Sequence, residues 1–86
     1  MRISVDAHTP SSADLPDGWE EDGMALTAWS VAISDDYGDL EPRVALTVEE
    51  VGRAGEGMIL HLSPELTRHL RATLGTALRQ MGEAEG

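Results

Sequence analysis

The sequence predicts an α+β fold: an antiparallel meander of three or four strands packed on one C-terminal helix. Three runs of strand-forming residues alternate with a period of two and are separated by turn-forming segments. A final run follows in which leucines recur every three and four residues, the spacing of an amphipathic helix. Short consecutive strands with turns between them favour a meander, and the leucine stripe gives the helix a face to pack against it.

The three strand runs carry the same alternation of large apolar and smaller side chains. They are residues 24–34, 43–51 and 58–62. If Ile33 pairs near Val44, all the large apolar residues fall on one face, as a buried sheet face requires. A weaker alternation in residues 1–6 predicts a short fourth strand. The predicted apolar face consists of Trp29, Val31, Ile33, Val44, Leu46, Val48, Met58, Leu60 and Leu62.

The C-terminal helix has clear start and stop signals. Ser63 can accept a hydrogen bond from the first turn, Pro64 suits the first helical position, and Glu65 lies at the positive end of the helix dipole. Gly82 is expected to end the helix. Its apolar stripe is predicted to be Leu66, Leu70, Leu74, Ala77, Leu78 and Met81.

We expect one domain, residues 24–86, preceded by residues 1–23, which hold the short strand and an acidic arm. The arm, residues 7–23, contains two Pro, two Gly and two Ser, a composition that favours a loop. Trp19 is either an anchor that holds the arm to the domain or a contact for a partner.

The negative charge is concentrated in the first half of the chain. Residues 1–41 carry ten acids against one arginine, a charge of −9, and residues 42–86 carry six acids against five arginines, a charge of −1; together they give the net −10. Such a surface suits steered association with a basic protein partner. Partner contacts are therefore expected at Asp17, Trp19, Glu20, Glu21, Asp22, Asp35, Asp36 and Asp39.

Composition also bounds the class of protein. With no Cys, disulfides and thiolate chemistry are excluded, and no apolar run is long enough to span a membrane, so a cytoplasmic location is expected. All six basic residues are Arg, which is typical of a high-GC bacterium or phage. With no Phe, one Tyr and two Trp, the core is small, and a second copy of the chain is the expected partner that completes it.

No cofactor or metal site is predicted. The acids of residues 35–41 do not match the spacing of an EF-hand loop, and the three histidines show no metal-ligand spacing. His61 is expected to make a cross-strand polar pair with Glu49 or Thr47.

A row of arginines is predicted on one side of the helix, at Arg68, Arg71 and Arg79. Three arginines in a chain of net charge −10 are too few for direct nucleic-acid binding. Their expected counter-charges are the acidic arm of the same chain or that of a second subunit.

Together these features predict a small acidic, non-enzymatic protein-interaction or regulatory module that forms a homodimer. One alternative is an acidic blocker, such as an antitoxin, immunity protein or phage inhibitor, that masks a basic nucleic-acid-binding surface. The other is an enzyme or metal-binding protein, which would use His61 with Glu49, or the acids of residues 35–41 with a metal ion.

Overall fold

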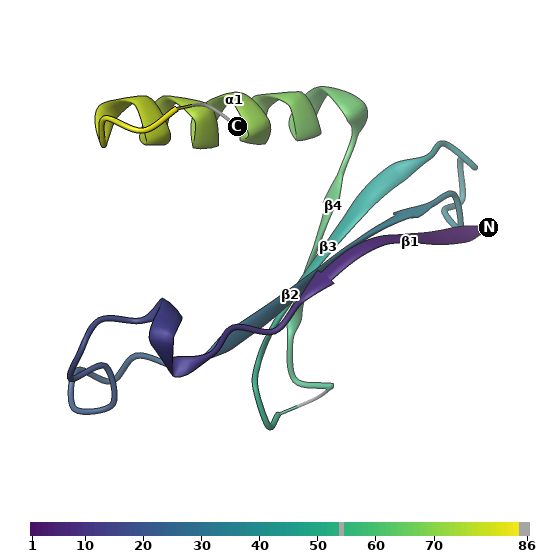
Figure 1. The fold of residues 1–86 in the computed structure, drawn as a ribbon. Coiled ribbons are helices and arrows are strands. Elements are labelled where there is room, and N and C mark those ends of the chain that lie inside the picture. Colours follow the sequence, from purple (N-terminus) through teal and green to yellow (C-terminus); the bar gives the residue numbers. More distant parts are fainter. Residues whose placement is uncertain (54, 85–86) are drawn as a thin grey trace.

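The sheet and the C-terminal helix expected from the sequence both form. The computed structural model describes residues 1–53 and 55–84 and is an α+β fold, a four-stranded antiparallel sheet followed by one helix (Figure 1). The strands lie in the order in which they occur in the chain. The elements are β1 (Arg2–His8), the 3-10 helix η1 (Ser12–Asp14), β2 (Thr27–Ser34), β3 (Arg43–Glu50), β4 (Met58–Leu62) and α1 (Pro64–Gln80).

The predicted register between β2 and β3 is confirmed, and β4 pairs with β3 on its other side. Across β2 and β3 the pairs are Ile33 with Val44, Val31 with Leu46 and Trp29 with Val48. Across β3 and β4 they are Val44 with Leu62, Leu46 with Leu60 and Val48 with Met58. Side chains of directly opposed residues lie on the same side of a sheet, so these nine residues form one surface, which we call the apolar face.

The fourth strand, which the sequence predicts over residues 1–6, is β1, and it continues to His8. Its register shifts between Ser4 and Asp6, where one extra residue is accommodated as a bulge. Before the bulge Ile3 lies opposite Ile33 and extends the apolar face, whereas after it Asp6 lies opposite Val31. The β1 edge of the apolar face is therefore partly polar.

The boundaries of α1 follow the predicted signals. The Ser63 hydroxyl accepts a hydrogen bond from the Leu66 amide at 3.1 Å, and Pro64 occupies the first turn. Gly82 follows the last turn with φ of +82°, a left-handed conformation that glycine adopts without a Cβ clash.

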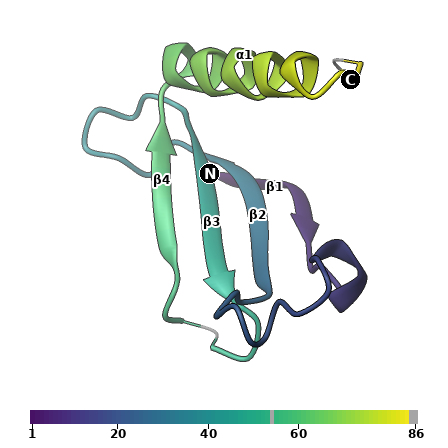
Figure 2. The same cartoon turned by 90° about the vertical axis from the view of Figure 1, so that its left-hand side faces the viewer.

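The apolar face forms but is only partly buried, which corrects the expectation of a buried sheet face. Among the described residues, helix α1 contacts the strands β3 and β4 alone, and it crosses the sheet near one end of the strands (Figure 2). A helix about 10 Å across that crosses the strands at one end covers only part of strands that are 8 residues and about 26 Å long. Met58 and Leu60 are consequently 71% and 48% exposed.

The chain as a whole is correspondingly extended. Among the described residues, the buried hydrophobic side chains are those of Ala32 and Ala45 alone, and both belong to the opposite, small-residue face. The radius of gyration of the Cα atoms is 15.3 Å, against about 12 Å for a compact chain of this length. One copy of the chain therefore assembles its apolar surfaces without enclosing them.

Replacing Gly57 with Ala is expected to lower the free energy of unfolding by about 1–3 kcal/mol. A Cβ at this position would overlap the Val48 carbonyl oxygen and approach the Glu49 Cβ to 2.7 Å, so β3 or β4 would have to shift. Urea unfolding measures the change. Gly38→Ala is the matched control because nothing lies within 4 Å of its Cβ; equal losses for the two variants would contradict the close approach.

Candidate functional site

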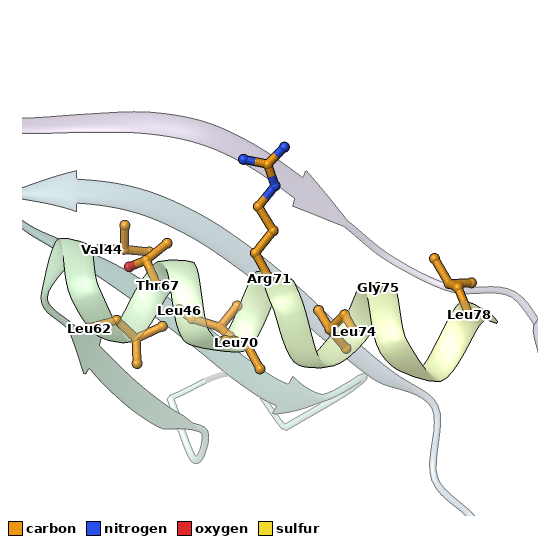
Figure 3. Close-up of a pocket in the computed structure, with 9 residues that line it drawn as sticks. All are labelled: Val44, Leu46, Leu62, Thr67, Leu70, Arg71, Leu74, Gly75 and Leu78. Atoms are coloured by element: carbon orange, nitrogen blue, oxygen red, sulfur yellow. The ribbon is translucent and has the colours of Figure 1, made fainter. Parts of the chain in front are cut away.

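A groove lies between α1 and the apolar face. It has a volume of about 500 Å³. The sheet contributes apolar side chains from β3 and β4, and the helix contributes one side of its leucine stripe (Figure 3). The lining residues are Val44, Leu46, Leu62, Thr67, Leu70, Arg71, Leu74, Gly75 and Leu78.

The leucine stripe is only partly used within the chain. Leu70 is half-buried near the start of the groove, but Leu74, one turn later, is 58% exposed although it lines the same groove. Figure 1 shows the reason, because α1 and the strands diverge from the point where β4 ends and the helix does not run along the sheet. The second half of α1 and the open part of the apolar face are thus two uncovered apolar surfaces on one side of the molecule.

The predicted arginine row lies on α1, but the structure does not join it to the acidic arm. Arg71 lines the groove and points away from Leu62 and Leu70 (Figure 3), and Arg68 borders a second hollow of about 300 Å³ near Ile33. Within the described part of the chain neither Arg68 nor Arg71 makes an ion pair. Arg79 donates a hydrogen bond to the Thr76 hydroxyl at 3.0 Å.

The acidic arm lies at the other end of the sheet. It connects the end of β1 to the start of β2, whereas α1 follows β4 at the end where Arg2, Ser34 and Leu62 lie (Figure 2). Trp19 is half-buried, and the arm acids are exposed. In the residues that the structure covers, no ion pair involves Asp17, Glu20, Glu21 or Asp22.

The aspartates of the β2–β3 loop have charged partners within the described chain, unlike the acids of the arm. Asp39 holds Arg43 through two hydrogen bonds of 2.9 and 2.7 Å and also accepts the Glu41 amide at 3.0 Å. Asp35 and Asp36 accept hydrogen bonds from the Met1 amino group at 2.7 and 3.0 Å. Much of this loop's charge is therefore balanced locally, which the separate counts of acids did not reveal.

His61 has a different partner from the one predicted. It lies opposite Ala45, and its Nδ1 is 2.9 Å from the Tyr37 hydroxyl. The Tyr37 ring in turn lies 4.6 Å below the Arg43 guanidinium, a cation–π contact. Small residues on this side of the sheet leave room for the ring, and that is the signal that sequence reasoning missed.

The suggested pairing of His61 with Glu49 is not assembled. The Glu49 carboxylate instead accepts a hydrogen bond from the Gly55 amide at 3.3 Å in the β3–β4 turn. In residues 1–53 and 55–84, no three His, Asp or Glu side chains gather closely enough to hold a metal ion. The same residues include no helix long and apolar enough to cross a membrane.

The Asp39 carboxyl is expected to titrate below its ordinary pKa of 3.8. Its hydrogen bonds with the Arg43 guanidinium, followed by the one from the Glu41 amide, favour the charged form and lower the pKa. The stabilisation is therefore present above pH 3.8 and is lost as the pH falls through the lower, folded-state pKa. Carboxyl-carbon NMR titration measures this, and Arg43→Gln should move the pKa back toward 3.8; an unchanged value would contradict the assignment.

Comparison with known proteins found no matching family model, no matching curated protein and no matching solved structure.

Proposed function

We propose that this chain is a non-enzymatic protein-interaction module that works as a homodimer and presents its acidic arm to a basic protein partner. The observation that carries the proposal is the unenclosed apolar surface. Monomeric proteins rarely expose a continuous apolar patch of more than a few hundred Å², and a larger one marks an interaction surface. Here that surface includes the open part of the apolar face and the exposed side of the α1 leucine stripe.

The distribution of charge separates two roles within the module. The nine residues of the apolar face and the leucine stripe include no acid, and Asp6 lies beside them at the β1 edge, opposite Val31. The centre of this surface can therefore be removed from water without burying an unpaired carboxylate. The arm acids remain exposed without an ion pair among the described residues, and they are free to steer a basic protein toward the dimer.

Sedimentation equilibrium tests the homodimer. The expected mass is twice the chain mass of 9.2 kDa at micromolar concentration. A folded species of 9.2 kDa, with the helix signal intact in circular dichroism, would contradict it.

The unpaired arm acids also favour a second candidate, an acidic blocker that masks a nucleic-acid-binding surface on another protein. In this case the carboxylates of Glu20, Glu21 and Asp22 occupy sites that phosphates otherwise fill. The blocker predicts that affinity for a basic target falls steeply with salt and that replacing these three acids with their amides weakens binding. Affinity that is insensitive to both changes would exclude the blocker.

A further inference from the structure

We propose that α1 of each copy lies across the open apolar face of the other copy, in a twofold dimer in which the helix end of one sheet covers the arm end of the other. This inference rests on the proposed homodimer and identifies its contact surface. It assigns partners to the two surfaces that one chain leaves uncovered. It also assigns partners to Arg68, Arg71 and the arm.

The sizes of the uncovered surfaces fit a stable contact. Strands β2, β3 and β4, of about seven residues each, form an apolar face of about 330 Å², one end of which α1 already covers, and a helix of 17 residues adds an area of about 250 Å² on one side. Together with the contacts of the arm they approach the roughly 600 Å² per partner of the smaller specific protein interfaces. Reciprocal packing uses both surfaces in each copy, because a twofold axis repeats every contact.

The charges select the orientation of the two copies. If the arm ends overlapped, two groups of unpaired acids would face each other, and the helix ends would bring the arginine rows together. In the opposite orientation, Arg68 and Arg71 of one copy face two of the five acids of the other copy's arm, which leaves three arm acids for the basic partner. Neither these two arginines nor the arm acids make an ion pair within the described chain. In this orientation they can form ion pairs with each other between the two copies.

Pairing of β4 with β4 of a second copy is the competing arrangement. The strand is an edge without a charged residue, and such an edge can add a further strand. Edge pairing would cover Ile59 and Met58 but would leave the second half of α1, including Leu74, without a partner. The stacked arrangement is preferred because it covers both uncovered surfaces.

Isotope-filtered NOE spectroscopy on dimers refolded from one labelled and one unlabelled copy distinguishes the two arrangements. The stacked arrangement predicts contacts between copies from the methyl groups of Leu74 and Leu78 to the side chains of Trp29 and Val48. Contacts between copies confined to β4 residues such as Ile59 would overturn it while leaving the homodimer intact. A sedimentation mass of one chain would instead reject the proposed homodimer itself.

A charge exchange tests the orientation. Arg71→Glu should raise the dimer dissociation constant about fivefold, and adding Glu21→Arg should recover most of the loss. Arg53→Glu is the matched control, because it changes the net charge equally but lies in the β3–β4 turn at the arm end, where Arg53 pairs with Glu50 at 3.2 Å and where a further acid would not face the acids of the other copy. An effect of Arg71→Glu no larger than that of Arg53→Glu, or no recovery in the double variant, would overturn the orientation.

Discussion

Leu46→Asp is expected to abolish the dimer and to lower the free energy of unfolding by roughly 2–5 kcal/mol. Leu46 lies at the centre of the apolar face, between Val31 on β2 and Leu60 on β4, and it lines the groove under α1. A carboxylate there removes apolar contacts within the chain and places an unpaired charge in the surface that a second copy covers.

The matched control for Leu46→Asp is Thr47→Asp, which places the same charge at the next position of β3 but on the other side of the sheet. Sedimentation and urea unfolding of the two variants measure the effect. The control should remain dimeric. A Leu46→Asp protein that kept the dimer mass would contradict the assignment of the apolar face to the interface.

Leu74→Glu is expected to weaken the dimer about thirtyfold, the effect of losing an interface residue that contributes about 2 kcal/mol. Leu74 is 58% exposed in one chain, so within a monomer the substitution should change stability by no more than about 0.5 kcal/mol. In the homodimer the same side chain is enclosed between α1 and the other copy, where a carboxylate would lose its hydration. A monomer and the homodimer therefore predict very different effects of Leu74→Glu.

Concentration-dependent sedimentation of Leu74→Glu gives the dissociation constant. Thr73→Glu is the control, since it adds an equal charge to the neighbouring position on α1, which does not line the groove. Equal dissociation constants for the two variants would show that the leucine stripe lies outside the interface.

The secondary structure and strand register were predictable because their causes are local. Alternation in β2 and β3 predicted a register that keeps Trp29, Val31 and Ile33 on a single face, and the structure has that register. The ends of α1 were likewise set by Ser63 and Gly82, whose side-chain and backbone chemistry acts within one turn.

The burial of these surfaces was not predictable from the same patterns. An apolar stripe on a helix indicates that something covers it, but the period is the same whether the cover is the chain's own sheet or another molecule. The exposure of Leu60 and Leu74 became evident only from the direction in which α1 leaves β4. This is why the expected buried face was found open.

The partners of the charged and aromatic groups were predicted least well. Asp39 was interpreted as one of several acids facing a partner, yet Arg43, four residues later, holds it in two hydrogen bonds. His61 was assigned a neighbour on β3, whereas the loop before β3 brings Tyr37 to it. Loop conformation decides both contacts, and composition and periodicity carry little information about it.

The central claim is that a second copy completes the fold. Urea unfolding of the unmodified chain, followed by circular dichroism at two protein concentrations a hundredfold apart, tests it most directly. When only the folded state associates, mass action stabilises the more concentrated sample by about 2.7 kcal/mol, so the unfolding midpoint should rise with concentration. Coincident midpoints at both concentrations would contradict the claim.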